Sequence, residues 1–299
     1  MKQVRASLLL PVIGFSLLSI PVLVAADSAP GTIGKGADTL PVFDAHMHYK
    51  RAAWAPFPPN VVLSMMDRNA VSMALVSSSP DEGTIRLWEF APNRIVPEMR
   101  PYTDDVGSSN WTKWEEVGDY IDERVRQYPH EGIGEFHLHR VDPQDEPQMK
   151  RIVALALEKQ LPLHVHSDRQ TVEYLYTLGP DLTIIWAHAG MMEPADVVAD
   201  MMATYPTLYA DTSYREMDIL DDKGGIDEAW RQVLERFSDR FMIGSDTWVN
   251  DQWEDYDELI AAHRKWLAHL TPETAKKIAF RNAERLFGRT IDASRIGTR

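Results

Sequence analysis

Short apolar runs that end in histidine or aspartate constrain this chain more than any other feature of its sequence. Four such runs occur, PVFDAHMH, LPLHVH, TIIWAH and RFMIGSD, and their polar ends are His46, His48, His166, His188 and Asp246. Apolar runs of this length are typical of strands that are buried on both faces of a parallel sheet. The five side chains would converge only if these strands lay side by side with their C-terminal ends together. The pattern therefore predicts a parallel sheet.

The pair His46 and His48 is spaced for binding one metal ion. Side chains alternate between the two faces of a strand, so both imidazoles point the same way and can hold an ion about 2.0–2.1 Å from each nitrogen. Surface histidines also pair by chance, so this pair alone is a weak signal. The later runs strengthen it, because they follow at the spacing of one or two strand–helix units. The sequence therefore predicts a metal site.

Strands and helices alternate along the chain without an internal repeat or a low-complexity insert. Eight strand–helix units favour an α/β fold of the (β/α)8 TIM-barrel type, whose active site lies at the C-terminal ends of the strands. A doubly wound open sheet is the alternative, but it would bring together only the residues near one switch point. The predicted strands cover residues 41–48, 71–78, 94–102, 132–139, 161–166, 182–188, 207–212 and 240–246.

Residues 1–26 have the parts of a secretory signal peptide. Lys2 and Arg5 form the charged beginning, residues 8–24 are apolar, and residues 24–26 (Val-Ala-Ala) form a small-residue cleavage site. The alternative is an uncleaved membrane anchor, but proline and glycine interrupt the apolar stretch and no stop-transfer charges follow it. We therefore expect an exported protein, periplasmic or secreted after cleavage, without a stable membrane anchor.

The rest of the chain is expected to form one domain. Residues 27–40 are predicted as a flexible lead-in, residues 41–290 as a single catalytic barrel and residues 291–299 as a C-terminal tail. About 270 residues remain after removal of the leader, which is close to the size of one TIM barrel. The chain contains no cysteine, so disulfides and a lipid-modified cysteine are excluded.

The charge of the chain excludes some partners. The formal net charge is −14, and loss of Lys2 and Arg5 with the leader would change it to −16. Neither a nucleic acid nor an anionic membrane attracts a chain of that sign. We therefore expect a small-molecule substrate and no nucleic acid. A homodimer is a hypothesis that rests only on how barrels of this kind often assemble.

Five segments resemble, in their order, the motifs of the amidohydrolase superfamily. They are DAHMHY, LPLHVHS, IIWAHAG, FMIGSDTW and the late KIAFRNAERLFG. The chain is most similar to the amidohydrolase-related branch, which includes aminocarboxymuconate-semialdehyde decarboxylase and dicarboxylate lactonases. The resemblance spans about residues 40–290. It implies a TIM barrel with metal-dependent chemistry, but such motifs are poor at naming a substrate.

The resemblance also bears on Glu135, which lies in the run GIGEFHLH of the fourth expected strand. Some members of the superfamily carry a bridging carboxylate on this strand. In a two-metal site of that kind, His46 and His48 would hold one ion, His166 and His188 the other, and Glu135 would lie between them. The alternative is that Glu135 orients a ligating histidine by accepting its hydrogen bond.

Decarboxylase-like members of the branch imply a one-metal site instead. The histidine pair of the first strand, His166 and Asp246 would then hold a single ion, and His188 would transfer protons. In the superfamily the strand-five ligand follows a proline by four residues, here Pro162, which selects His166 over the deeper His164. Zinc is the expected divalent ion, and manganese, cobalt or iron also suit such ligands. The number of ions, one or two per chain, stays open.

Asp246 is the predicted general base. At the end of the last strand its carboxylate can contact the metal and accept a proton from metal-bound water, whose pKa the ion lowers to about 7. The alternative is a helix N-cap, which is disfavoured because the next helix is expected to begin near Asp251. His188 would polarise the substrate carbonyl or move a proton if it is not a ligand of a second ion.

Several polar side chains are candidates for binding the substrate. Arg100 lies at the end of expected strand three, and Arg169 and Arg215 follow expected strands five and seven. Each could clamp a carboxylate with two parallel hydrogen bonds. His137 is a further candidate on strand four. Tryptophans in the expected loops at the same end would contact a flat substrate or simply pack across the mouth. They are Trp54, Trp111, Trp114, Trp248 and Trp253.

These features predict an exported, metal-dependent hydrolase in which metal-activated water attacks the carbonyl of a small amide, ester or lactone. The arginines favour an acidic substrate and the tryptophans an aromatic one. The first alternative is a non-oxidative decarboxylase that uses the same site. The second is a non-catalytic barrel that binds metal or solute, which the complete set of metal ligands argues against.

Overall fold

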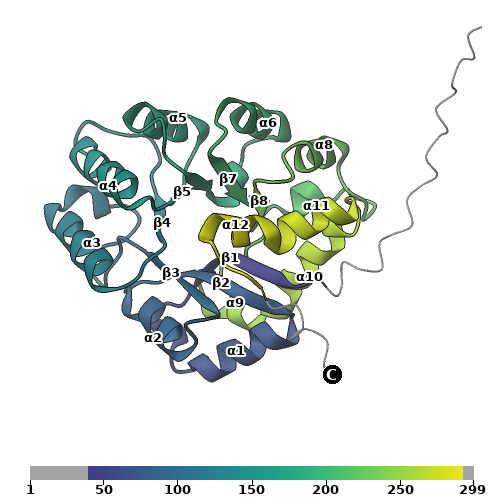
Figure 1. The fold of residues 1–299 in the computed structure, drawn as a ribbon, viewed down its shortest axis with the longest axis horizontal. Coiled ribbons are helices and arrows are strands. Elements are labelled where there is room, and N and C mark those ends of the chain that lie inside the picture. Colours follow the sequence, from purple (N-terminus) through teal and green to yellow (C-terminus); the bar gives the residue numbers. More distant parts are fainter. Residues whose placement is uncertain (1–39, 292–299) are drawn as a thin grey trace, which may run out of the picture. The chain divides into compact units, whose positions relative to one another are not determined.

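Eight parallel strands form the centre of the structure, a computed structural model that describes residues 40–291. The strands pair in sequence order, and every pair of neighbours is parallel. Figure 1 shows the helices outside the strands. The strands are β1 (Val42–His48), β2 (Val71–Ser77), β3 (Ile95–Met99), β4 (Gly132–His137), β5 (Leu163–His166), β6 (Ile184–Trp186), β7 (Leu208–Asp211) and β8 (Phe241–Met242).

The sheet closes on itself between β1 and β8. Asp44 of β1 bridges Ile243 in parallel orientation, and the amide of Ala45 donates to the Ile243 carbonyl at 2.8 Å. Farther along, the amide of Asp246 donates to the carbonyl of His46 at 2.6 Å. This closure confirms the predicted (β/α)8 barrel and excludes the open doubly wound sheet, whose two edge strands do not meet.

Amphipathic helices cover the outside of the barrel. In α4, Met149, Ile152 and Val153 are buried at the spacing of one helical stripe, and Pro147 stands in the first turn, where its missing N–H leaves no bond unmade. The helices are α1 (Pro59–Arg68), α2 (Glu82–Phe90), α3 (Glu115–Gln127), α4 (Glu146–Lys159), α5 (Arg169–Leu178), α6 (Ala195–Thr204), α7 (Glu216–Ile219), α8 (Glu228–Arg236), α9 (Asn250–Glu254), α10 (Tyr256–Leu267), α11 (Pro272–Lys276) and α12 (Asn282–Phe287).

Several predicted strands end earlier than the sequence suggests, and beyond two of these ends lies a predicted site residue. β6 stops at Trp186, and His188 lies in a short 3₁₀ turn with a φ of 55°. β8 stops at Met242, and Asp246 has a φ of 47°. Residues other than glycine rarely adopt positive φ, and such strain, of order 1–3 kcal/mol, is concentrated at functional sites. The backbone therefore turns at both residues instead of continuing as a strand.

Gly244 allows the end of β8 to pass close to β1. A Cβ at this position would lie 2.5 Å from the Cβ of His46, so a larger residue would push the two segments apart. The following amide, of Ser245, donates to Oδ1 of Asp44 at 2.9 Å. These two contacts bring Asp246 to the side of His46.

Residues 40–291 all belong to one compact unit. None of the helices in this range is long and apolar enough to cross a membrane. The predicted signal peptide (residues 1–26) and nearly all of the predicted lead-in and C-terminal tail lie outside the described residues. Export and cleavage therefore stay predictions.

The C-terminal helix fastens the short last strand. Nδ2 of Asn282, a buried residue at the start of α12, donates to the carbonyls of Ser238 and Phe241 at 2.8 and 2.7 Å. A two-residue strand makes few ladder bonds of its own, so these side-chain bonds fix the position of β8. The late motif KIAFRNAERLFG thus has a structural role, which is to complete the barrel next to the site.

We predict that Asn282→Ala lowers the free energy of unfolding by roughly 1–3 kcal/mol, because it leaves buried carbonyl oxygens without a donor. Urea denaturation followed by circular dichroism measures this change. Asn60→Ala, on the exposed side of α1, is the matched control and should change the stability by less than about 0.5 kcal/mol. Equal effects of the two substitutions would contradict the role given to Asn282.

Candidate metal centre

The six predicted ligands converge at the C-terminal end of the barrel. The two histidines of β1 point to the same side, as strand alternation requires, and the others come from β4, β5 and the turns after β6 and β8. Each side chain places a nitrogen or oxygen within 3.2 Å of another member of the group. The six residues are His46, His48, Glu135, His166, His188 and Asp246.

One half of the group consists of the β1 histidines and two carboxylates. Nε2 of His46 and Nε2 of His48 are 3.1 Å apart. Nε2 of His48 lies 3.1 Å from Oδ1 of Asp246 and 3.2 Å from Oε2 of Glu135. Nε2 of His46 lies 3.4 and 3.7 Å from the same two oxygens. Two nitrogens and two oxygens therefore face one small space.

The other half contains two histidines and the second oxygen of Glu135. Oε1 of Glu135 lies 2.8 Å from Nδ1 of His166 and 3.4 Å from Nε2 of His188. The two imidazole nitrogens are 3.2 Å apart. Glu135 is therefore placed between two histidine pairs, with one carboxylate oxygen facing each pair.

The hydrogen-bond partners of the outer ring nitrogens identify the tautomers of the two β1 histidines. Nδ1 of His48 lies 2.8 Å from the carbonyl oxygen of Ser77, which can only accept, so this nitrogen carries the proton. Nδ1 of His46 lies 3.3 Å from the carboxylate of Asp211 and is protonated for the same reason. With the outer nitrogens protonated, the inner Nε2 atoms are the ones that could offer lone pairs to a metal ion, and carboxylate oxygens face them. Such a cluster of acceptors fits a shared cation.

The charges in the cluster also favour a bound cation. Burial alone would lower the pKa of His46, but the surrounding carboxylates, first that of Asp246, raise it well above its ordinary value. Burial would raise the pKa of Glu135, yet the neighbouring imidazoles lower it well below its usual range. The pKa of Asp246 is likewise lowered to about 2 by the β1 histidines, against the effect of burial. Both carboxylates are therefore ionised near neutral pH, and the site attracts positive charge.

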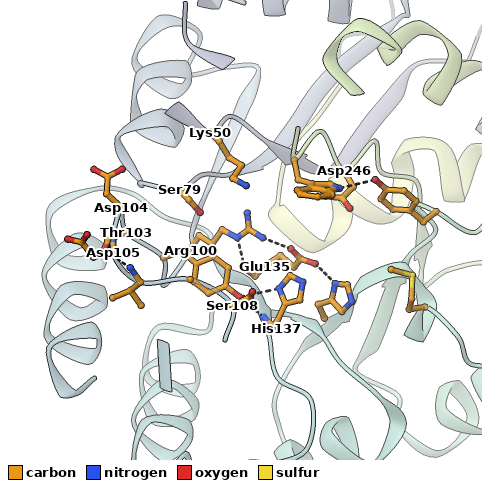
Figure 2. Close-up of a pocket in the computed structure, with 17 residues that line it drawn as sticks. Lys50, Ser79, Arg100, Thr103, Asp104, Asp105, Ser108, Glu135, His137 and Asp246 are labelled. Atoms are coloured by element: carbon orange, nitrogen blue, oxygen red, sulfur yellow. Dashed lines mark hydrogen bonds and ion pairs between the residues drawn. The ribbon is translucent and has the colours of Figure 1, made fainter. Parts of the chain in front are cut away.

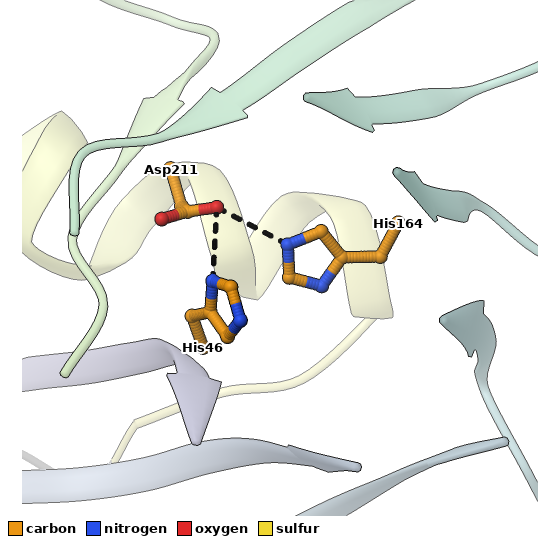
Figure 3. A group of neighbouring side chains, drawn as sticks. All are labelled: His46, His164 and Asp211. Atoms are coloured by element: carbon orange, nitrogen blue, oxygen red, sulfur yellow. Dashed lines mark hydrogen bonds and ion pairs between the residues drawn. The ribbon is translucent and has the colours of Figure 1, made fainter. Parts of the chain in front are cut away.

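Asp211, at the end of β7, lies one layer deeper in the barrel than the predicted ligands and orients histidines from there. Its Oδ2 lies 3.3 Å from Nδ1 of His46 and 3.1 Å from Nε2 of His164 (Figure 3), and it accepts the amide of His188 at 3.2 Å. His164 is fully buried, and its Nδ1 lies 3.2 Å from a carboxylate oxygen of Glu98. A carboxylate behind a ligating histidine fixes the ring and raises its basicity.

Asp211, Ser77 and Ser213 take part in this arrangement but are not among the predicted ligands or substrate-binding residues. Asp211 ends the apolar run TLYADT, so it carries the same sequence signal as the predicted ligands. Ser77 and Ser213 have no such signal. Ser77 acts partly through its main-chain carbonyl, and Ser213 places its hydroxyl 2.9 Å from Nδ1 of His188 only because β7 ends beside β6.

A pocket of about 660 Å³ opens onto the metal centre. Glu135, His166 and Asp246 contribute to its inner end, and this volume fits a small molecule. Trp248 also lines it, whereas the other four tryptophans expected at the mouth are not among the lining residues. Figure 2 shows residues that line the pocket, among them Arg100, Glu135, His137 and Asp246. The remaining lining residues include Lys50, Ser79, Arg100, Tyr102, Asp104, Asp105, His137 and Tyr214.

Arg100 and His137 lie in the pocket, as predicted, but both have partners in the protein. Nη2 of Arg100 donates to Oε2 of Glu135 at 2.7 Å, and its Nε donates to the Glu135 carbonyl at 2.9 Å. Nδ1 of His137 lies 3.1 Å from the hydroxyl of Tyr102, and burial lowers the pKa of His137 to about 3, so its ring is neutral. Arg100 therefore holds the central carboxylate, and contact of either residue with substrate stays a prediction.

Arg169 and Arg215 lie outside the residues that line the pocket. Nε of Arg169 donates to Glu173 at 2.8 Å, one turn along α5. Arg215 is buried, donates to the Glu193 carbonyl at 2.7 Å and stacks over the ring of Trp230. These local partners engage both guanidinium groups. Their predicted role in binding a substrate is not supported by this placement.

We predict that Asp211→Asn weakens metal binding roughly tenfold to hundredfold, because the substitution keeps the size of the side chain and removes the charge behind His46. Metal retained after dialysis against graded chelator, measured by elemental analysis, tests this. Asp145→Asn is the control: Asp145 is also buried and accepts hydrogen bonds, from Thr112 and the amide of Asp142. Metal affinity equal to that of the unaltered protein in Asp211→Asn would refute the orienting role.

Solved structures with a similar barrel share little sequence with this chain. A candidate 2-pyrone-4,6-dicarboxylic acid hydrolase from Pseudomonas putida is 16% identical over 85% of this chain and 99% of its own, with a TM-score of 0.58. The phosphotriesterase homology protein from Escherichia coli, in complex with phosphate, is 11% identical over 84% and 99%, with a TM-score of 0.57. A mutant organophosphorus hydrolase from Deinococcus radiodurans is 15% identical over 83% and 93%, with a TM-score of 0.54. At these identities the likeness shows the fold alone.

The sequence itself matches a known family over most of its length. No curated protein is a significant match to the whole chain. The family model described as Amidohydrolase matches residues 43–289, a range that includes all six converging side chains from His46 to Asp246. The chain belongs to the amidohydrolase family.

Proposed function

We propose that this protein is a metal-dependent hydrolase that cleaves the ester, lactone or amide bond of a small molecule. The observation that carries the proposal is the position of Glu135, whose two carboxylate oxygens face two separate histidine pairs at the inner end of a pocket. Membership of the amidohydrolase family agrees with it. So do the similar structures, which are named as hydrolases of a pyrone dicarboxylic acid and of organophosphorus compounds.

The donor set fits two divalent cations. The β1 histidines, Asp246 and Oε2 of Glu135 would hold one, while His166, His188 and Oε1 of Glu135 would hold the other. Bound ions polarise a carbonyl oxygen and lower the pKa of water, which makes a nucleophile available at neutral pH. Zinc is the ion we expect, and the nitrogen and oxygen donors also suit manganese, cobalt or iron.

Asp246 is placed to move the proton of the attacking water. Its Oδ1 faces the β1 histidines, whereas its Oδ2 is 3.9 Å from Nε2 of His188 and its side chain lines the pocket. Its pKa, lowered to about 2, keeps it ionised at neutral pH, so it can accept a proton and return it to the leaving oxygen or nitrogen. Arg100 holds Glu135 in place during this exchange.

A decarboxylase of the one-metal type is less compatible with the geometry. That arrangement needs His188 free to transfer protons. Here Nδ1 of His188 lies 2.9 Å from the hydroxyl of Ser213, and its Nε2 faces His166 and Glu135. A histidine held at both nitrogens is better suited to be a ligand than a mobile proton carrier. A non-catalytic binding protein is also disfavoured, because the ligands and the proton acceptor are all present beside a pocket.

We further propose that the protein acts after export, since its first 26 residues have the pattern of a signal peptide. The substrate is then a small molecule of that compartment. A homodimer stays a hypothesis.

The first test of the proposal is the metal content of the purified protein. We predict about two ions per chain by elemental analysis, with about one lost in Glu135→Gln and in His166→Ala. His166→Ala removes a donor of the ion that His166 and His188 would hold, and Glu135→Gln removes the charge that both ions would share. His139→Ala is the control, since His139 is exposed beside the site and is not in the ligand set. A single ion that survives Glu135→Gln would favour the one-metal alternative, and none after reconstitution would overturn the proposal.

The second test concerns the proton acceptor. We predict that Asp246→Asn lowers kcat for hydrolysis of 4-nitrophenyl esters or lactones roughly 10²- to 10⁴-fold, because the amide cannot take a proton. Asp251→Asn, at the exposed start of α9, should leave kcat within about twofold. Release of carbon dioxide is measured in parallel. Carbon dioxide release from candidate acids without hydrolysis of any ester, lactone or amide would replace the proposed reaction with decarboxylation.

A further inference from the structure

Two polar groups in the pocket have no hydrogen-bond or ion-pair partner among the described residues. Lys50 lies two residues after β1, and its ammonium makes neither a hydrogen bond nor an ion pair within residues 40–291. It lies 5.4 Å from the centre of the Trp248 ring. The hydroxyl of Ser79, two residues after β2, is buried and has no hydrogen-bond partner in the same range. Buried polar atoms in native proteins are usually paired, so the Ser79 hydroxyl needs an explanation. Lys50 is only half-buried, but its charge faces the pocket without a carboxylate contact.

The two groups face the same part of the pocket. Figure 2 shows the polar ends of Lys50 and Ser79 on the side of the pocket where the guanidinium of Arg100 lies. Lys50, Ser79 and Arg100 lie within two residues of the ends of three neighbouring strands, β1, β2 and β3. The barrel therefore fixes their spacing. Arg100 is already bonded to Glu135, whereas the charge of Lys50 is not matched by any carboxylate contact.

We propose that Lys50 and Ser79, beside Arg100, form a subsite that binds a carboxylate group of the substrate. The inference rests on the proposed hydrolase function and narrows it to small anionic esters, lactones or amides. One ammonium and one hydroxyl offer donors to the two oxygens of a carboxylate, and a hydrogen bond from a charged donor is stronger than one between neutral groups. The bond to be cleaved would then lie towards Glu135 and Asp246, which line the inner end of the same pocket.

The negative groups that line the pocket do not occupy this subsite. Asp104 is exposed and forms an ion pair with Arg51 at 2.9 Å. Asp105 is exposed at the outer edge, where water screens its charge. At the inner end, Glu135 is held by Arg100, and Asp246 faces the β1 histidines. The ammonium of Lys50 is therefore the charge that a substrate anion would meet unpaired.

Calorimetric titration with phthalate and with its neutral analogue phthalamide tests the subsite in the metal-loaded protein. We expect Lys50→Met to lower the ratio of their association constants roughly tenfold to hundredfold, the loss expected for a charge-assisted hydrogen bond. Ser79→Ala should lower it less, and Lys50→Arg should restore most of it. Lys150→Met makes the same change of charge on exposed α4 and should leave the ratio unchanged. A ratio that Lys50→Met does not alter, or alters no more than Lys150→Met, overturns the proposal.

Two further measurements separate this inference from the proposed function. Inorganic phosphate is titrated in parallel, and binding that depends on Lys50 for phosphate but not for phthalate would overturn the carboxylate assignment. The ratio of kcat/KM for mono-4-nitrophenyl succinate over 4-nitrophenyl acetate should also fall roughly tenfold or more in Lys50→Met. If the unaltered protein hydrolyses neither ester, the hydrolase proposal loses its support. The phthalate titration still decides whether the anion subsite exists.

Discussion

The buried carboxylate of Glu135 is the group on which the rest of the site depends. An ionised carboxylate that is 2% exposed is unfavourable unless it is paired on all sides. Arg100 pairs with it from the end of β3, and histidines from β1, from β5 and from the turn after β6 face its two oxygens. These partners meet only in a closed barrel. The charge of Glu135 is therefore compensated only when the ends of all these strands are in place.

Precision at the centre comes from strained turns that neighbouring strands hold in place. His188 and Asp246 have positive φ, which an isolated segment would avoid. The amide of Asp246 is held by the carbonyl of His46, and the ring of His188 is held by Ser213. The His46 carbonyl lies on β1 and Ser213 lies just after β7, so contacts with neighbouring strands maintain the strain. This explains why the site is assembled at the strand ends, where the backbone can turn towards the barrel axis.

Strand periodicity accounts for what the sequence could predict. The β1 histidines and Glu135 share the inner face of their strands because side-chain direction on a strand follows from local geometry alone. The turns at His188 and Asp246 could not be predicted in the same way, since their φ values depend on contacts with other strands. Arginine positions in loops are less predictable still. Arg169 and Arg215 follow strands, yet local partners hold them outside the pocket.

The net charge of the chain is a poor guide to the charge of its substrate. A formal charge of −14 opposes the approach of an anion, but at physiological ionic strength such repulsion is largely screened beyond about 8 Å. Within the pocket only nearby groups matter, and Glu135 is paired with Arg100 while Asp246 faces the β1 histidines. Lys50 lacks a carboxylate partner among the described residues. An acidic protein can therefore select an acidic substrate, because long-range charge affects the rate of encounter and local charge determines what stays bound.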